Sequence, residues 1–334
     1  MKTAFFEIRD KDQQVYFSQN LEGHEVAFFE NPLNEDSIPQ NTDFEVISIF
    51  VQSLLTPKVL NSFPNLKYIT VRATGFDNVN CEFAKTKNIS ISNVPAYGSN
   101  TVAEFTFGLI LSLSRKIPQA AYRLKLSGEF STDGFKGFDL NGKTLGVVGT
   151  GKIGSNVIKI AKGFNMQVLA MDPHPNDELS KNLGFSYVTL EELLKNSDIV
   201  TLHVPLVEQT HHLINKGNIS LMKKGSLLIN TSRGGVVDTD ALSKALTQEH
   251  LAGAALDVLE EENELKEEAQ LLTQDKIPQE DFQKIIEDHI LMHLPNVIIT
   301  PHMAFYTKEA EESIMQTTIS NIAAFIKGTA ENLV

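Results

Sequence analysis

The chain has 334 residues, too many for one ordinary hydrophobic core, and its 42% hydrophobic and 21% charged residues are typical of globular proteins, so we expect two domains. Its net charge of -13 argues against nucleic acid as a partner, because phosphate binding needs concentrated Lys and Arg, although one Arg can still bind a small anionic substrate. Cys81 is the only cysteine, which excludes an intrachain disulfide and fits a reducing compartment.

The N-terminal segment and the longest apolar stretch indicate where in the cell the protein is expected. The N-terminal segment turns charged at Glu7, too early for the apolar core of a signal peptide. The longest apolar stretch, 105–113, falls well short of the roughly 20 residues that a membrane span needs. We therefore expect a cytoplasmic protein without a membrane partner.

Short apolar runs alternate with polar segments over the first hundred residues. Five runs are rich in β-branched and aromatic residues and are predicted to be strands, at 3–8, 25–29, 45–50, 66–71 and 88–94. Helical segments lie between several of them, so parallel βα units are the simplest interpretation.

A helix is predicted next, over 98–118. Thr101 with Glu104 fits a capping box at its start, and Pro118 ends it. The middle of the helix is apolar on nearly every face, which predicts burial at a domain or subunit interface. We take this as an indication of a homodimer.

The second half opens with an apolar strand followed by Gly149-x-Gly151-x-x-Gly154 and an amphipathic helix. Gly149 suits a tight turn, Gly151 lets a pyrophosphate approach the backbone, and Gly154 allows close helix–strand packing. The next strand ends at Asp172, where a carboxylate accepts a ribose 2′-OH and repels a 2′-phosphate. The pattern predicts a dinucleotide site that binds NAD rather than NADP.

Four later strands are predicted at 199–204, 226–232, 252–258 and 296–302. The acidic stretch from 260 to 292 is predicted to be helical and largely solvated. A final helix, over 308–328, is expected to pack back on the first domain and bring the chain ends together.

Three ionisable residues follow the later strands, at the edge where open α/β sheets bind ligands. Arg233 follows one of them and can hold a carboxylate with two parallel hydrogen bonds; alternatively it is a surface arginine. His302 ends the last one, and Glu262 is a possible partner that would raise the pKa of the imidazole and make it a proton donor at neutral pH. The alternative for His302 is a core histidine satisfied by hydrogen bonds.

The motif order resembles that of the D-isomer-specific 2-hydroxyacid dehydrogenases over essentially the whole chain: "GTGKIG", "TSRGG", "LDVLEEE" and "TPHMAFYT". "RATGFDNV", "SNVPAYGSNTVAE" and "HMAFYT" are similar to the branch that contains the D-lactate dehydrogenases. The implied fold class is α/β, with two doubly wound parallel-sheet domains and a cleft between them. A flavodoxin-like substrate domain would comprise 1–98 and 302–334, and a Rossmann NAD domain 99–301.

The resemblance also implies roles for individual residues. His302 would be the acid/base, Glu262 would hold and tune it, and Arg233 would bind the carboxylate of a 2-oxo acid and polarise its carbonyl. On the substrate side the matching positions are Phe50, Thr74, Gly75 and Tyr97, of which Phe50 would limit substrate size unless it is an ordinary core residue. The cofactor-contact positions are Gly149, Gly151, Lys152, Ile153, Gly154, Asp172, Val204, Pro205, Thr210, Thr231, Ser232 and Asp257. No metal ion is implied.

The implied reaction is reduction of pyruvate to D-lactate by NADH. A first alternative is a dehydrogenase for larger 2-oxo acids such as 2-oxoisocaproate or phenylpyruvate. A second is an NAD-sensing corepressor on the same fold, since fold does not fix function. Two departures from the family pattern are Met303, where a smaller or polar residue is expected, and Gly235, where proline is common. Met303 bears on the substrate more than on the reaction.

Overall fold

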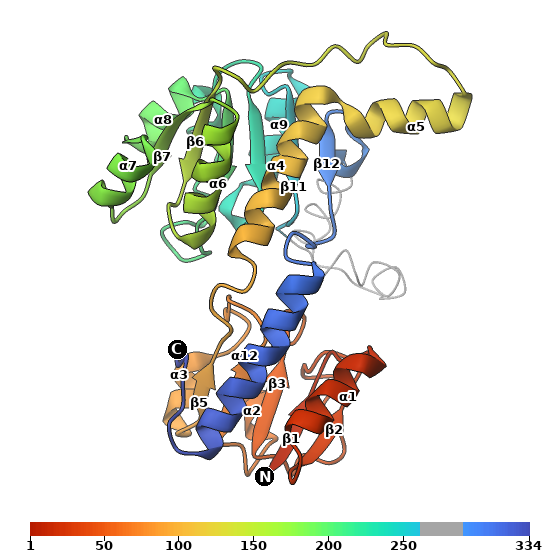
Figure 1. Ribbon diagram of the computed structural model, residues 1–334, viewed down its shortest axis with the longest axis vertical. Coiled ribbons are helices and arrows are strands. Elements are labelled where there is room, and N and C mark those ends of the chain that lie inside the picture. The colour runs from red at the N-terminus through yellow and green to blue at the C-terminus, as the bar shows by residue number, and fades with distance from the viewer. Residues whose placement is uncertain (261–289) are drawn as a thin grey trace. The chain divides into compact units, whose positions relative to one another are not determined.

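The computed structural model describes residues 1–260 and 290–334. The chain divides into two compact units, Met1–Tyr97 with Tyr306–Val334, and Gly98–Phe305 (Figure 1). The chain passes from the first unit to the second after Tyr97 and returns to the first after Phe305. His302 therefore belongs to the second unit and not to the first. Each unit is an α/β domain in its own right.

The first unit is built on a five-stranded sheet, all of whose pairs are parallel, in the order β2-β1-β3-β4-β5. Its strands are β1 (Lys2–Phe5), β2 (Glu25–Phe28), β3 (Val46–Ile49), β4 (Tyr68–Val71) and β5 (Ser90–Ser92), and its helices are α1 (Lys11–Asn20), α2 (Pro57–Asn61), α3 (Cys81–Thr86) and α12 (Lys308–Ile326). The C-terminal helix packs on this sheet, as expected: Phe325 stacks on Tyr68 of β4 with ring centroids 4.2 Å apart.

Side chains alternate along these strands and fill a core on each face of the first sheet. Phe5 and Val46 pack with α1 and α12, whereas Ile47 and Ile69 pack with α2 and its neighbours. The strand order reverses at β1, between β2 and β3, which is where open α/β sheets bind ligands at their carboxyl ends.

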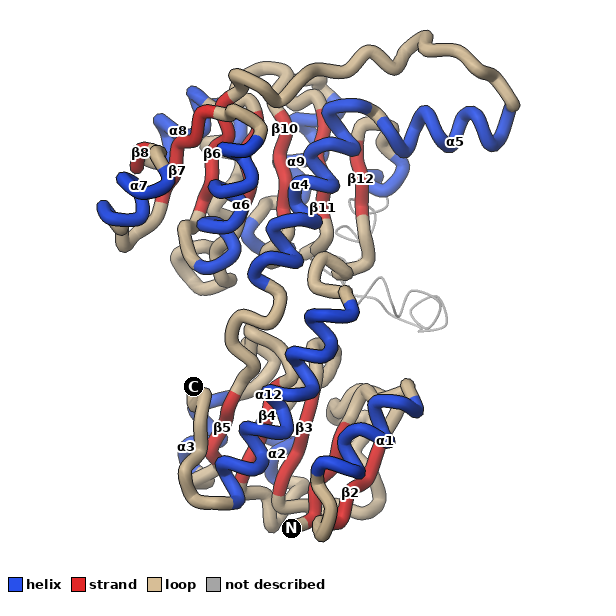
Figure 2. Tube along the Cα trace, viewed as in Figure 1, coloured by secondary structure: helices blue, strands red, loops and turns tan. Residues whose placement is uncertain are grey.

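The second unit has a seven-stranded parallel sheet in the order β12-β11-β10-β9-β6-β7-β8 (Figure 2). Its strands are β6 (Thr144–Val148), β7 (Gln167–Met171), β8 (Ser186–Tyr187), β9 (Ile199–Leu202), β10 (Leu227–Asn230), β11 (Gly253–Leu256) and β12 (Val297–Ile299). Its helices are α4 (Ser99–Arg115), α5 (Ile117–Ser127), α6 (Lys152–Gly163), α7 (Asp177–Leu183), α8 (Leu190–Asn196) and α9 (Thr239–Thr247), with short 3-10 turns η1 (Ile219–Leu221) and η2 (Gly234–Val236).

Helices also cover both faces of the second sheet. Phe107 of α4 and Val157 of α6 pack on one face, and Leu193 of α8 and Leu242 of α9 pack on the other. The predicted fold class, α/β with two doubly wound parallel-sheet domains, is therefore confirmed. The two-residue strand β8 had not been predicted, because it is too short for a periodic pattern.

The start and the end of the helix α4 differ from two expectations. It begins at Ser99 after Gly98, without a side-chain cap, so Thr101 and Glu104 do not form a capping box. Its buried side chains lie in the core of its own unit, where Glu104 is exposed, and burial of its remaining faces against a second subunit stays a prediction. It ends at Lys116, whose left-handed backbone turns the chain into α5, and Pro118 lies in the first turn of that next helix.

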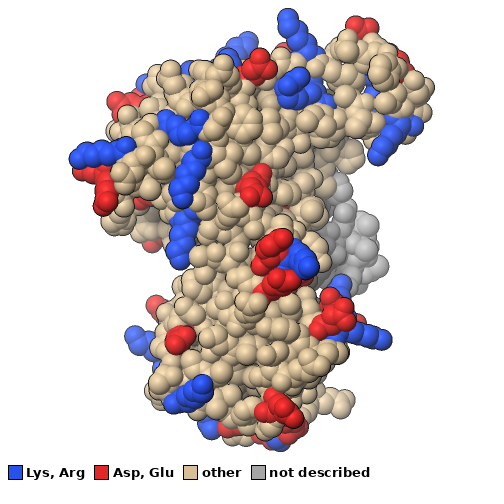
Figure 3. Space-filling view, viewed as in Figure 1, with Lys and Arg blue, Asp and Glu red and all other residues tan. Residues whose placement is uncertain are grey.

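Acidic and basic side chains are interspersed over the visible face of each unit (Figure 3). Among the helices in the described part of the chain, none is both long enough and apolar enough to cross a membrane.

Candidate active site

The glycine-rich loop of the second unit lies between β6 and α6, at the point where the order of the seven-stranded sheet reverses. A Cβ on Gly149, whose φ is +91°, would come within 2.5 Å of the carbonyl oxygen of His203. A Cβ on Gly154 would come within 1.9 Å of the carbonyl oxygen of Gly149, so helix and loop pack in direct contact. By contrast, no described atom beyond the neighbouring residues in the chain lies within 4 Å of a Cβ on Gly151, which leaves the backbone open there.

The N-terminus of α6 is suited to an anion. Gly151 is its N-cap and contributes no side chain, so the amides of the first turn, which begins with Lys152 and Ile153, carry no side-chain cap. Unpaired amides and the positive end of the helix dipole favour a phosphate at this position. The residues present therefore fit a dinucleotide pyrophosphate over Gly151.

Asp172 follows β7 beside this loop. Its Oδ2 accepts hydrogen bonds from the Thr150 amide at 2.7 Å and from the Thr150 hydroxyl at 3.0 Å, and its Oδ1 accepts one from the His174 amide at 2.9 Å. Burial opposes ionisation, but these hydrogen bonds outweigh it and lower the pKa of Asp172 below its usual value. The group is thus a carboxylate at neutral pH, as the discrimination against a 2′-phosphate requires.

The loop after β9 carries three of the predicted cofactor positions. Val204 is buried, and the Thr210 hydroxyl donates to the Pro205 carbonyl oxygen at 2.6 Å and accepts from the Val207 amide at 2.9 Å. Thr210 thereby closes its own loop. His203, at the start of the loop, pairs through Nε2 with the Thr201 hydroxyl at 2.9 Å, and burial lowers the pKa of its imidazole to about 3.

The loop after β10 places Arg233 on an extended backbone. Asn230 shapes this loop, because its side-chain oxygen accepts from the amide and hydroxyl of Ser232 and its side-chain nitrogen donates to the Arg233 carbonyl oxygen at 2.9 Å. Arg233 Nη1 donates to the Ser232 carbonyl oxygen at 2.8 Å. Thr231 is buried and pairs with the hydroxyl of Thr106 at 3.0 Å, which ties the loop to α4.

The glycines after Arg233 allow another backbone to approach. A Cβ on Gly234 would lie 1.9 Å from the carbonyl oxygen of Leu259, whereas one on Gly235 would meet only side chains, the nearest being Leu206 at 3.3 Å. A Cβ at position 235 would thus meet no backbone, so the loop does not require glycine at this position, where proline is common in the family pattern.

The loop that carries His302 is held by Asp257, which follows β11 and is 1% exposed. Asp257 Oδ1 accepts from the Thr300 hydroxyl at 2.5 Å and the Met303 amide at 3.0 Å, and Oδ2 accepts from the Ala304 amide at 2.8 Å. The His302 amide donates to the Asp257 carbonyl oxygen at 2.9 Å. Burial raises the pKa of the Asp257 carboxyl, although these hydrogen bonds oppose the rise.

This contact network gives His302 a left-handed backbone, with φ +51°, and a partly buried position. The Met303 side chain is 38% exposed. Glu262, the expected partner of His302, lies outside the described residues. Arg233 and His302 leave the carboxyl edge of one parallel sheet, after the two strands that flank β11.

A histidine pair lies near the end of the described part of this region. His212 Nε2 pairs with Glu260 at 2.7 Å, and the Thr239 hydroxyl donates to the other oxygen of Glu260 at 3.0 Å. The rings of His211 and His212 stack with centroids 4.0 Å apart and planes 25° from parallel. One ligand atom from each of His211, His212 and Glu260 lies within 4.8 Å of the others, so these three side chains are close enough to hold a metal ion.

In the first unit, the predicted substrate-side residues follow neighbouring strands at the carboxyl edge. Phe50 follows β3, Thr74 and Gly75 follow β4, and Tyr97 follows β5. The Thr74 hydroxyl donates to the Val94 carbonyl oxygen at 3.0 Å, which ties the loops after β4 and β5 together. Phe50 is partly buried against the core beside α2, so both interpretations of its role stay open.

The residues whose side chains hold these loops in place were not predicted from the sequence. Asn230 and Thr300 are examples in the second unit, and Glu7, Arg72 and Asn78 are examples in the first. Most of their partners are distant in sequence, so only their types and their places at strand ends offered any signal.

The sequence and the fold are similar to those of proteins of known family. Residues 107–304 match the family described as "D-isomer specific 2-hydroxyacid dehydrogenase, NAD binding domain". The D-lactate dehydrogenase of Escherichia coli is 37% identical over 332 residues, which cover 98% of each chain. The chain belongs to the D-isomer-specific 2-hydroxyacid dehydrogenases.

Solved structures of this family agree with the fold. A D-lactate dehydrogenase from Aquifex aeolicus, crystallised with NAD and lactic acid, has a TM-score of 0.89 and 38% identity, covering 99% of this chain and 98% of that one. A D-2-hydroxyisocaproate dehydrogenase has a TM-score of 0.83 and 32% identity, covering 100% and 99%. This D-2-hydroxyacid dehydrogenase is thus an oxidoreductase that acts on a CH–OH group, and its second unit contains the NAD-binding domain.

Proposed function

We propose that this D-2-hydroxyacid dehydrogenase reduces pyruvate to D-lactate, with NADH as the hydride donor. The observation that carries the proposal is the His302 loop, which a buried carboxylate holds at the same sheet edge from which Arg233 departs. Similarity to D-lactate dehydrogenases over nearly the whole chain supports the choice of substrate.

In the proposed reaction each residue has a separate task. Arg233 binds the carboxylate of pyruvate with parallel hydrogen bonds and polarises the adjacent carbonyl. The nicotinamide supplies the hydride to C2 when it is bound. The His302 imidazolium gives its proton to the carbonyl oxygen, so that one hydride and one proton convert the ketone to an alcohol. Glu262 stabilises the protonated form of His302.

The first unit supplies the substrate side of the proposal. Backbone amides at Thr74 and Gly75 bind the carboxylate, Tyr97 contacts the substrate, and the Phe50 ring limits the size of its side chain. If Phe50 leaves more room than we propose, the preferred substrate is a larger 2-oxo acid, as the name of the related D-2-hydroxyisocaproate dehydrogenase indicates for that enzyme.

We also propose that the enzyme is a homodimer in the cytoplasm. Support for the dimer comes from α5, which projects with the following loop from the body of its unit and contributes no buried residue (Figure 1). Tyr122, Leu126 and Phe130 are 65%, 69% and 95% exposed, a density of apolar surface that favours a protein contact. The single cysteine is compatible with a reducing compartment.

The test is NADH oxidation by the purified protein against 2-oxo acids of increasing size, with His302→Ala as the control for catalysis. We expect the highest kcat/KM with pyruvate and a lower one with 2-oxoisocaproate and phenylpyruvate. A clear preference for either of the larger acids would overturn the D-lactate assignment and leave the family assignment intact.

A further inference from the structure

The segment 50–53, which follows β3 and carries Phe50, is bound by a single carboxylate. Glu7 Oε1 accepts hydrogen bonds from the amides of Phe50 and Ser53, both at 3.0 Å, and from the Ser53 hydroxyl at 2.5 Å. Glu7 Oε2 accepts from the Gln52 amide at 2.9 Å. Three backbone N–H groups of one short segment thus converge on one side chain, the arrangement by which backbones bind anions.

The same segment is held through its carbonyl groups. The Asn78 side-chain nitrogen donates to the carbonyl oxygens of Phe50 and Ser53, both at 2.8 Å. The Ser53 hydroxyl also accepts from the Leu33 amide at 2.9 Å. Because donors and acceptors at both ends of the segment are engaged, the direction in which the chain leaves Phe50 is restricted.

Glu7 is itself fixed by the backbone around it. It follows β1 with a left-handed backbone, φ +61°, a conformation that side chains other than Gly, Asn and Asp seldom adopt. Arg72, which is 4% exposed, donates to the Phe6 carbonyl oxygen at 2.6 Å and to the Ser48 hydroxyl at 2.9 Å. Its guanidinium lies 5.9 Å from the centroid of the Phe50 ring, so the same cation braces both the turn at Glu7 and the ring.

These contacts lie where ligands are expected. β1 and β3 are neighbours at the reversal point of the five-stranded sheet (Figure 1). Glu7 and Phe50 follow the carboxyl ends of these two strands. A carboxylate at such an edge normally faces solvent or a ligand, whereas this one is directed at the loop of Phe50.

We infer that Glu7 is a positioning residue for substrate selection, which acts by holding the 50–53 segment so that the Phe50 ring keeps its place. The inference rests on the proposed role of Phe50 as the residue that limits substrate size. Glu7 does not touch the substrate in this account; it acts through Phe50.

Glu7→Gln is the direct test, because the amide keeps the shape of the side chain but replaces one acceptor oxygen with a donor that faces N–H groups. We expect the ratio of kcat/KM for 2-oxoisocaproate to that for pyruvate to rise about tenfold, within the roughly 10–200-fold range of hydrophobic pocket changes. The dissociation constant of NADH should stay as in wild type.

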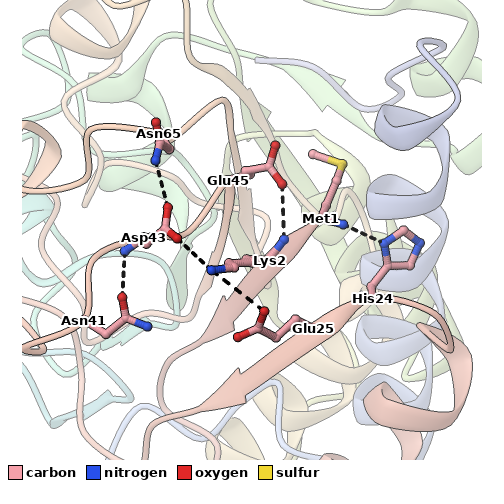
Figure 4. Close-up of polar contacts among 8 residues, drawn as sticks. All are labelled: Met1, Lys2, His24, Glu25, Asn41, Asp43, Glu45 and Asn65. Atoms are coloured by element: carbon pink, nitrogen blue, oxygen red, sulfur yellow. Dashed lines mark hydrogen bonds and ion pairs between the residues drawn. The ribbon is translucent and has the colours of Figure 1, made fainter.

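Glu45→Gln is the matched control. Glu45 precedes β3, at the end of the strand opposite to Phe50, and its carboxylate accepts from the Lys2 amide at 3.3 Å (Figure 4). It also accepts from Lys67 at 2.8 Å, so the same substitution removes carboxylate hydrogen bonds at the other end of the strand. Its substrate ratio should equal that of wild type.

Hydrogen exchange gives a readout that does not depend on activity. In Glu7→Gln the amides of the 50–53 segment should exchange at least about tenfold faster, while those of β3 keep their wild-type rates. Asn78→Ala, which removes the donors to Phe50 and Ser53, should shift the substrate ratio in the same direction and serves as the test if Glu7→Gln does not fold.

A double variant separates this inference from the proposed function. If Glu7 acts through Phe50, adding Glu7→Gln to Phe50→Leu should change the ratio little. An unchanged ratio in Phe50→Leu itself would remove Phe50 from the site, and the inference with it. The role of Glu7 would be overturned, with the proposed function intact, if the substrate ratio shifted in Phe50→Leu but stayed at the wild-type value in Glu7→Gln and Asn78→Ala.

Discussion

The buried imidazole of His203 makes the folded second unit sensitive to acid. Its pKa of about 3, against 6.5 for an ordinary histidine, means that the unfolded chain binds a proton there while the folded chain does not. Stability from this residue is therefore complete above pH 6.5 and is lost as the pH falls toward 3. The cause of the low pKa is burial, and Nδ1 is itself buried without a hydrogen-bond partner among the described residues.

The size of the effect is set by linkage. Each unit of separation between the folded and unfolded pKa is worth about 1.4 kcal/mol, so the loss reaches about 2 kcal/mol at pH 5 and about 4 kcal/mol near pH 3. These values are upper limits, because the residue as a whole is only partly buried and solvent screens its charge.

The assay is urea unfolding of the cofactor-free protein at pH 8 and pH 5, for wild type and His203→Gln. Because the other titratable groups are the same in both proteins, the difference between their changes in unfolding free energy with pH is due to His203. We expect wild type to lose up to about 2 kcal/mol more than the variant between the two pH values. His174→Gln, at an exposed histidine of the same unit, should behave as wild type. An equal pH dependence in wild type and His203→Gln would refute the argument.

Three further predictions concern the proposed chemistry. His302→Ala should lower turnover by roughly 10²–10⁴-fold with little change in NADH affinity, and near-wild-type pyruvate reduction at pH 7 would contradict the proton-donor role. Glu262→Gln should move the high-pH limb of kcat/KM for pyruvate reduction to lower pH, because protonated His302 is the reactive form; a limb that stays in place would show that the two are not coupled. Asp172→Ala should narrow the gap between NADH and NADPH, mainly by weakening NADH, and efficient use of NADPH by the wild-type enzyme would show that the carboxylate does not discriminate.

Much of the fold was predictable because its signals are local. The strands of both sheets are short apolar runs, and the glycine loop is recognisable because Gly149, Gly151 and Gly154 stand between a strand and a helix. The faces of α4 were not predictable in this way. A nearly all-apolar sequence has the same pattern whether a helix is covered by its own domain or by a second subunit, and the buried side that packs on α6 and the seven-stranded sheet is visible only in the structure.

The sequence pointed to the residues that we propose to react more readily than to the residues that support them. Arg233 and His302 stand out because charged residues directly after buried strands are expected at the ligand edge. The residues that hold their loops in place do not stand out in the sequence, because a carboxylate that binds amides distant in the chain leaves no local sequence pattern. Glu7 reaches amides 43 to 46 positions away, and Asp257 reaches a hydroxyl and amides 43 to 47 positions away.

Asp257 is a support of this kind at a position that sequence resemblance assigns to the cofactor. Its contacts indicate that it also holds the His302 loop, and Asp257→Asn separates the two roles. Asparagine keeps one acceptor oxygen, but its NH₂ group is a donor and would face the amide or hydroxyl donors that the carboxylate accepts from. The buried donors left without an acceptor would each lower the free energy of unfolding by about 1–3 kcal/mol. If the carboxylate serves His302, kcat for pyruvate should fall roughly 10²-fold, the cost of a misplaced catalytic group, with NADH affinity retained. If it serves the cofactor, NADH affinity should fall first. The control is Asp198→Asn, because Asp198 accepts from the Thr144 amide at 2.8 Å at the start of β6, and its loss should cost stability without lowering kcat.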